Sequence, residues 1–166
     1  MTDKVLNVLF LCTHNSARSI LAEAILNHIG RGRFKAWSAG SSPRDNQQPN
    51  PLGLQVLQNA GISIQGLNSK YWDEFGRVDS PQMDLVITVC DNAAGEVCPY
   101  WPGQPATAHW GHPDPSAGDG TEAQKLEAFR QTLHAMKRRL ELLISLPPAK
   151  LEKTLLQSAA RQLARD

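Results

Sequence analysis

The chain has 166 residues, of which 41% are hydrophobic and 20% are charged, so it can bury one sizeable core in a single globular unit. Lys and Arg number 17 against 16 acidic residues, which excludes a global charge that would draw the chain to nucleic acid or to an anionic membrane. The apolar run Val5–Leu11 is too short to span a membrane and has no small-residue cleavage site, so we expect a cytoplasmic protein.

The first predicted strand ends at a cysteine. The apolar run Val8–Leu11 delivers Cys12 into a polar loop, and a helix with recurring apolar positions follows to Ile29. Backbone N–H groups of such a loop and of the helix N-terminus favour a bound oxyanion, and Arg18 adds a planar set of donors. The same field favours the thiolate, so we predict that Cys12 is a nucleophile. The oxyanion-binding residues that we predict are Thr13, His14, Asn15, Ser16, Ala17, Arg18 and Ser19.

Two residues of this loop have further expected roles. Asn15 suits a left-handed or strained backbone, and Ser19 can donate a hydrogen bond to the thiolate and cap the helix. Ordinary turn chemistry is the alternative role for both residues. An inert core residue is the alternative role for Cys12, but the order of strand, loop and helix favours catalysis.

Strands and helices then alternate along the chain. Asn50 and Pro51 are a helix N-cap and first helical residue, and Thr121 to Gln124 has the form of a capping box. The predicted elements are a strand at 33–39, a helix at 51–60, one or two helical turns within 70–76, strands at 83–89 and 106–110, and a helix from 121 to about 145.

This alternation predicts an α/β fold, a small doubly wound sheet of four parallel strands with helices on both faces. We expect a main domain at 1–146 and an amphipathic helical tail at 147–166, which either folds back on the domain or contacts a partner. Ligands of such sheets bind at the carboxyl ends of the strands. Cys12, Cys90 and the loop after Trp110 all fall at that edge.

The other two cysteines, Cys90 and Cys98, are joined by a small, polar segment that contains Gly95. Such a tether would let one thiol reach an active-site sulfur and then be reached by the other, so we predict thiol–disulfide exchange. A zinc site and two packed cysteines are the alternatives, and zinc lacks a four-ligand spacing here. Three cysteines, an odd number, in a chain without an export signal also favour reduced, chemically active thiols.

An acid completes the predicted site. Expelling an oxygen from a tetrahedral oxyanion needs a proton donor, and Asp114, held between Pro113 and Pro115, is the candidate. A simple turn residue is the alternative, because proline neighbours also favour turns.

These residues resemble the arsenate reductases that are built on the low-molecular-weight protein tyrosine phosphatase fold. The resemblance covers about residues 4–145, and it is carried by 12–19, by Cys90 and Cys98, and by 109–115. It implies that Cys12 attacks arsenate held by Arg18 and the loop, and that Asp114 protonates the leaving hydroxyl. Cys90 would then attack Cys12, and Cys98 would attack Cys90, leaving a Cys90–Cys98 disulfide.

The resemblance also implies the partners. We expect thioredoxin as reductant, with glutaredoxin or a low-molecular-weight thiol as alternatives, and no cofactor. A potassium site of some relatives is partly matched by Asn15, Glu23 and Ser38, but Lys70 stands where an acidic ligand would be. A fixed ammonium would supply that charge, so we expect no metal and little or no dependence on potassium.

Two other functions remain open at this stage. A phosphatase that hydrolyses aryl phosphates through a Cys12 phosphoenzyme would share the loop and the acid. Against it, no aromatic residue occurs from Ser38 to Lys70, and Ser116 and Ala117 follow the acid where those phosphatases typically carry a tyrosine. A sensor of oxyanions or redox state would bind and form disulfides without turnover.

Overall fold

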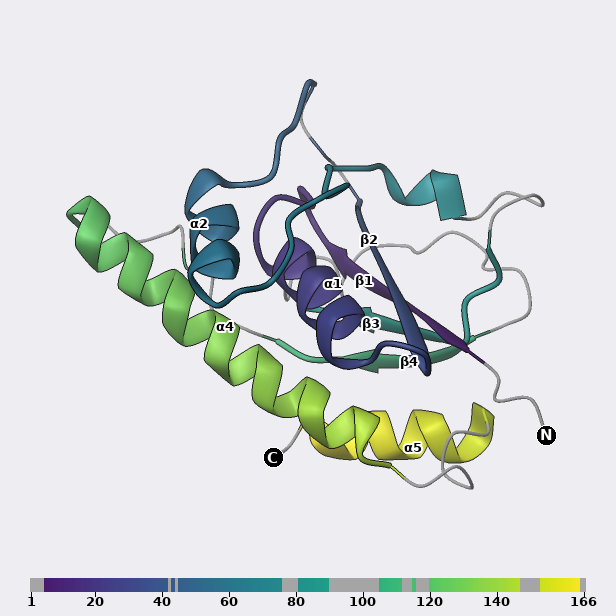
Figure 1. Cartoon of the computed structure of the whole chain (residues 1–166). Coiled ribbons are helices and arrows are strands. Elements are labelled where there is room, and N and C mark those ends of the chain that lie inside the picture. The colour runs from purple at the N-terminus through teal and green to yellow at the C-terminus, as the bar shows by residue number, and fades with distance from the viewer. Residues whose placement is uncertain are drawn as a thin grey trace.

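The computed structural model describes residues 5–41, 43, 45–75, 81–89, 105–111, 115, 120–146 and 153–164. Four parallel strands form one sheet in the order β2-β1-β3-β4. The strands are β1 (Leu6–Cys12), β2 (Phe34–Gly40), β3 (Leu85–Thr88) and β4 (Ala106–His109). The helices are α1 (Arg18–Ile29), α2 (Pro51–Asn59), the 3-10 helix η1 (Trp72–Phe75), α4 (Glu122–Ile144) and α5 (Lys153–Leu163) (Figure 1). The predicted α/β sheet is confirmed.

The strand order places a topological switch between β1 and β3. The chain passes from β1 to β2 on one side and then crosses to β3 on the other side of β1. The pairing is parallel throughout, with Cys12 opposite Gly40 and Thr88 opposite both Leu11 and His109. All four strands therefore end at one edge, and ligands of open α/β sheets bind at the switch point of that edge.

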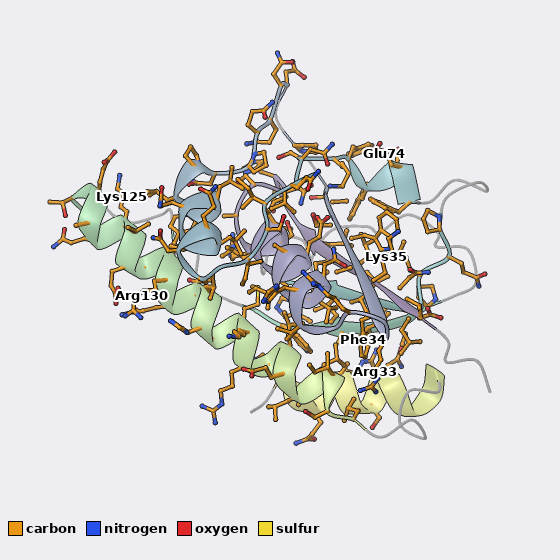
Figure 2. The ribbon with its side chains drawn as sticks, viewed as in Figure 1. Arg33, Phe34, Lys35, Glu74, Lys125 and Arg130 are labelled. Atoms are coloured by element: carbon orange, nitrogen blue, oxygen red, sulfur yellow. The ribbon has the colours of Figure 1, made fainter. Side chains whose placement is uncertain are left out.

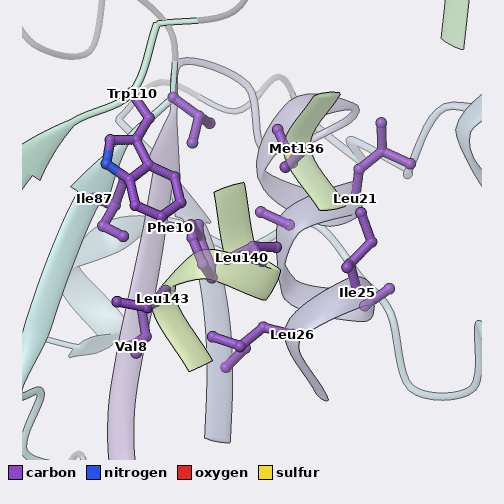
Figure 3. Packing of buried hydrophobic residues seen from close by; sticks show 14 of the residues in the cluster. Val8, Phe10, Leu21, Ile25, Leu26, Ile87, Trp110, Met136, Leu140 and Leu143 are labelled. Atoms are coloured by element: carbon purple, nitrogen blue, oxygen red, sulfur yellow. The ribbon is translucent and has the colours of Figure 1, made fainter. Parts of the chain in front are cut away.

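The two faces of the sheet have separate cores, because side chains alternate along each strand. Val8, Phe10 and Ile87 lie in the larger core with the apolar sides of α1 and α4, as Figure 3 shows. Leu9, Leu11 and Val86 lie in the smaller core on the other face, with Trp72 and Phe75 of η1. Burial on both faces explains why the central strands are continuous apolar runs.

Local signals set the starts of α2 and α4 as predicted. The Asn50 side chain accepts a hydrogen bond from the Leu52 N–H at 2.9 Å, with Pro51 as first helical residue. Thr121 and Gln124 form both hydrogen bonds of a capping box at the start of α4. Arg130 projects from the outer face of α4 (Figure 2). The buried residues of α4, spaced at helical intervals, are Phe129, Leu133, Met136, Leu140 and Leu143.

The C-terminal end of α4 is tied to the start of β2. Arg33 donates hydrogen bonds to the carbonyl oxygens of Ile144 at 2.7 Å and of Leu146 at 3.4 Å. Arginine can satisfy the last carbonyl groups of a helix, which have no partner within the helix. The following helix α5 lies along β4 (Figure 1), with Ala160 and Leu163 buried in the larger core. Within the described ranges no helix is long and apolar enough to cross a bilayer.

Candidate functional site

Cys12 ends β1 at the switch point and is only 5% exposed. Its carbonyl oxygen accepts a hydrogen bond from the Ser41 N–H at 3.1 Å, and the preceding Leu11 carbonyl accepts one from Val89 at 2.9 Å. The segments at Ser41 and Val89 thus fix, from either side, the backbone that carries the Cys12 sulfur. This is the position that a nucleophile needs at the carboxyl edge of the sheet.

The helix that follows the loop begins without a side-chain cap. α1 starts at Arg18, its N-cap residue is Ala17 with φ −126° and ψ −82°, and no side-chain hydrogen bond caps it among the residues described. The expectation that Ser19 caps this helix is therefore wrong, because Ser19 is already inside it and its Oγ accepts a hydrogen bond from Asn15. A helix N-terminus without a side-chain cap retains N–H donors for an anion.

Asn15 holds the loop from within. Its backbone has φ +55°, which is the left-handed one of the left-handed or strained geometries expected for it, and its side chain is fully buried. The amide nitrogen donates to the hydroxyls of Ser19 at 2.8 Å and Ser38 at 2.9 Å. The amide oxygen accepts the Lys70 N–H at 2.8 Å, and the Asn15 carbonyl accepts the Ser69 hydroxyl at 2.6 Å. Asn15 therefore positions the loop with its side chain rather than presenting that side chain to a ligand.

Backbone contacts with other elements complete this support. The Ser16 carbonyl accepts a hydrogen bond from the Asn50 N–H at 2.8 Å, which joins the loop to the start of α2. A Cβ at Gly40 would lie 2.6 Å from the Thr13 carbonyl oxygen and 2.9 Å from the Asn15 nitrogen. Sequence reasoning missed both contacts. A glycine that ends a strand beside a functional loop was the one available signal for the second.

The remaining loop residues differ in exposure. Ala17 is buried, whereas Thr13, His14, Ser16 and Arg18 are partly exposed. The described loop thus combines a buried nucleophile candidate with side chains that reach solvent, as an anion site at the protein surface requires.

Next to the residues that Asn15 contacts, Glu23 and Lys70 form a largely buried ion pair, with 3.8 Å between Glu23 Oε1 and Lys70 Nζ. Ser38 donates a short hydrogen bond to the same carboxylate, and Lys70 also donates to the Asn68 carbonyl at 2.6 Å. Burial raises the pKa of the Glu23 carboxyl, against the opposing effects of Lys70 and of the Ser38 hydrogen bond. Burial likewise lowers the pKa of the Lys70 ammonium, opposed by the charges of Glu23 and Glu74.

The Glu23–Lys70 ion pair lies at the positions where the family resemblance implies a potassium site. The Lys70 ammonium already faces the Glu23 carboxylate, which in turn is bonded to Ser38. A second cation there would be repelled by the ammonium, so these residues do not fit a bound potassium ion. No cluster of three or more His, Cys, Asp or Glu side chains suited to a metal occurs in the described ranges.

The ends of β3 and β4 are also joined. Thr88 Oγ1 lies 2.7 Å from His109 Nδ1, and the Trp110 N–H donates to the Thr88 carbonyl at 2.7 Å. The chain leaves these two strand ends toward Cys90 and toward Asp114. Cys90, Cys98 and Asp114 lie outside the described residues, so their roles and their approach to Cys12 stay predictions.

Comparisons with known proteins identify relatives of the chain. An arsenate reductase of Halalkalibacterium halodurans is 32% identical over 141 residues, covering 85% of this chain and 95% of that protein. A glutaredoxin arsenate reductase of Synechocystis is 30% identical over 138 residues, covering 83% and 95% respectively.

Solved structures agree with these relatives. An arsenate reductase in the oxidized state has a TM-score of 0.66 and 28% identity, covering 88% of this chain and 98% of that one. A thioredoxin-dependent arsenate reductase of Corynebacterium glutamicum has a TM-score of 0.55 and 26% identity, covering 86% of this chain and 65% of that one.

The family comparison extends over most of the sheet and helices described above. Residues 7–157 match the low molecular weight phosphotyrosine protein phosphatase family. The matched range includes the Cys12 loop, β1 from its second residue onward, the other three strands and α4. The chain therefore belongs to the low molecular weight phosphotyrosine protein phosphatase family.

Proposed function

We propose that this protein reduces arsenate to arsenite. The observation that carries the proposal is the buried Cys12 at the switch point, followed by a loop and a helix N-terminus without a side-chain cap. Such a site binds a tetrahedral oxyanion beside a sulfur nucleophile. The names of the relatives and the presence of Cys90 and Cys98 in addition to Cys12 favour reduction over hydrolysis.

The first step is attack by the Cys12 thiolate on arsenic. Arg18 and the loop N–H groups bind the arsenate oxygens, and Asp114 supplies the proton with which one oxygen leaves as water. A sulfur–arsenic bond forms and an arsenic–oxygen bond breaks, so arsenic is still in its oxidized, pentavalent state. Asn15 and Gly40 serve this step by keeping the loop in its binding conformation.

The second step transfers two electrons to arsenic. The Cys90 thiolate attacks the Cys12 sulfur, the sulfur–arsenic electron pair passes to arsenic, and arsenite leaves. Cys98 then attacks Cys90, which releases the Cys12 thiolate and leaves a Cys90–Cys98 disulfide. An external dithiol reduces that disulfide and restores the starting state.

Thioredoxin is the reductant that we propose. Relatives of both kinds occur, one named as glutaredoxin-linked and one as thioredoxin-dependent. The cascade of three cysteines ends in a Cys90–Cys98 disulfide, and a protein disulfide is the substrate that a thioredoxin dithiol reduces. We further infer a cytoplasmic location, because the cascade needs three thiols that are kept reduced between turnovers.

The test follows NADPH consumption in a mixture of reduced protein, arsenate, thioredoxin, thioredoxin reductase and NADPH. Many turnovers by the wild type, and none by Cys12→Ser, Cys90→Ser or Cys98→Ser, support the cascade. Replacing the thioredoxin system by glutaredoxin, glutathione and glutathione reductase decides the reductant. The arsenite produced is measured directly, so that NADPH loss is tied to product.

Phosphatase activity is the second candidate function, because the family takes its name from it. It predicts that an aryl phosphate is hydrolysed through Cys12 while Cys90→Ser and Cys98→Ser retain wild-type rates. Hydrolysis without arsenate-dependent NADPH loss would replace the proposed function by this one. A sensor would instead form one disulfide per molecule and stop.

A further inference from the structure

Helix α5 supplies the hydrogen bonds of a missing neighbour strand at the edge of the sheet. β4 is an edge strand, and Ala106 and Trp110 direct their N–H groups to β3. Thr107 therefore directs its N–H and carbonyl outward. The Gln157 side chain accepts that N–H at 3.1 Å, and Arg161 Nε donates to that carbonyl at 3.1 Å.

The same helix also fixes the end of β4. The Trp110 ring is fully buried in the larger core, and its Nε1–H donates to the Ala160 carbonyl of α5 at 2.8 Å. Ala160 itself is fully buried, so the two elements are in direct contact. Arg161 adds a second bond at 3.2 Å, from Nη2 to the Thr107 hydroxyl.

These contacts continue into the carboxyl edge of the sheet. From Trp110 the main chain is bonded to Thr88, and His109 is bonded to the Thr88 side chain. Asp114 follows Trp110 by four positions in the sequence, and Cys90 follows Thr88 by two. The family match ends at residue 157, so Ala160 and Arg161 lie beyond the matched region.

We propose that α5 is a positioning element for the reaction. By holding Thr107 and Trp110, it fixes the strand end from which the chain runs on to the predicted acid, Asp114. This inference rests on the proposed function. The bonds described above join α5 to Thr107 and Trp110, so its effect on the reaction passes through β4. A small displacement of a reacting group lowers the chemical rate much more than it lowers binding.

The test uses the full-length chain with two kinds of substitution. Trp110→Phe keeps a buried ring and removes the indole donor, and the double variant Gln157→Ala with Arg161→Ala removes the bonds to Thr107. The matched control is the double variant Ser158→Ala with Gln162→Ala, which changes two exposed positions of the same helix. Thermal unfolding identifies a working temperature at which every variant is folded.

Two measurements are made at that temperature. The rate of amide hydrogen exchange at residues 105–111 reports how firmly α5 fixes β4. Residues 34–40, in the strand at the opposite edge of the sheet, are the internal reference. Steady-state kinetics with arsenate report the reaction. We expect faster exchange at 105–111 alone, kcat lower by about 10-fold and KM for arsenate within about 2-fold of wild type. The pH dependence of kcat should change on the limb that reports the acid.

Either of two results would overturn the proposal. Wild-type exchange at 105–111 in Trp110→Phe and in the Gln157/Arg161 variant would mean that α5 does not hold β4. Faster exchange with unchanged kcat would mean that the hold does not serve the reaction. Failure of the proposed function is distinguishable, because the wild type would then show no arsenate turnover while the exchange data still decide whether α5 holds β4.

Discussion

The two sides of the sheet are held by different kinds of contact. On the β1–β2 side, buried polar groups and close backbone contacts around Asn15 and Gly40 fix the oxyanion loop. On the β4 side, Gln157 and Arg161 of α5 bond to the exposed outer edge of the strand, and the buried Trp110 donates to the Ala160 carbonyl. Buried, non-redundant contacts tolerate little change, whereas exposed bonds contribute modestly. The loop therefore depends on buried contacts, whereas the outward groups of Thr107 depend on exposed bonds.

The strongest way to break this contrast is Gly40→Ala. The added Cβ would meet the Thr13 carbonyl and the Asn15 nitrogen at distances that real Cβ atoms do not adopt, so the loop must move. We expect kcat/KM for arsenate to fall by about 100-fold and the free energy of unfolding to fall by about 3 kcal/mol. Kinetics and urea denaturation measure the two effects.

The matched control is Gly53→Ala in α2. There the added Cβ would contact the Phe129 ring at 3.5 Å, an ordinary distance, and alanine favours the helix by about 0.5–1 kcal/mol. A Gly40→Ala protein as active as Gly53→Ala would show that the loop accommodates the added Cβ without losing its binding geometry.

The Glu23–Lys70 pair comes second. Lys70→Met leaves the buried Glu23 carboxylate without its ammonium, so we expect a loss of about 3 kcal/mol in the free energy of unfolding at pH 7. The double variant with Glu23→Gln removes both charges and should recover most of that loss. Urea denaturation of the wild type, both single variants and the double variant gives the coupling energy.

The pH dependence of this loss has a definite sign. Without Lys70, the pKa of Glu23 rises further above its ordinary value of 4.5, because burial is no longer opposed by the ammonium. The folded Lys70→Met protein then binds a proton more tightly than the unfolded chain, so its stability falls as pH rises through this range. Relative to wild type, the deficit should shrink as pH falls toward 4.5 and be largest at neutral pH. A deficit that is constant with pH would contradict a buried, unpaired carboxylate.

Arg161→Ala tests the exposed bonds on the β4 side. It removes exposed hydrogen bonds to Thr107 and should lower the free energy of unfolding by only about 0.5–1 kcal/mol. Thermal unfolding of this variant beside Gln162→Ala isolates the effect of the bonds from that of helix propensity. A loss as large as that of Gly40→Ala would erase the contrast between the two sides.

The smallest expected effect is that of potassium. Lys70 already supplies a positive charge to Glu23, so exchange of sodium for potassium at equal ionic strength should leave the rate of arsenate reduction unchanged. The initial rate is compared in the two salts at one arsenate concentration. Strong activation by potassium would refute the assignment of this charge to Lys70.

Periodicity in the sequence predicted the sheet and helices, because each central strand is apolar on both faces and α4 buries a regular stripe. The helix starts at Asn50 and Thr121 could also be predicted, because a capping side chain bonds to residues close to it in the chain. Asn15 was predicted as left-handed, but its bonds to Ser38 and Lys70 join distant segments and leave no local pattern. The error at Ser19 arose because the helix begins at Arg18, two residues earlier than a Ser19 cap would require, and because the Ser19 hydroxyl accepts a hydrogen bond from the Asn15 side chain of the same loop.

The hold of α5 on Thr107 also affects how copies of this chain meet one another. An edge strand with free N–H and carbonyl groups is a template on which another chain can add a strand, and such addition leads to aggregates. Here the outward groups of Thr107 are already bonded to Gln157 and Arg161. The helix that steadies β4 therefore also protects the protein against edge-to-edge association at that strand.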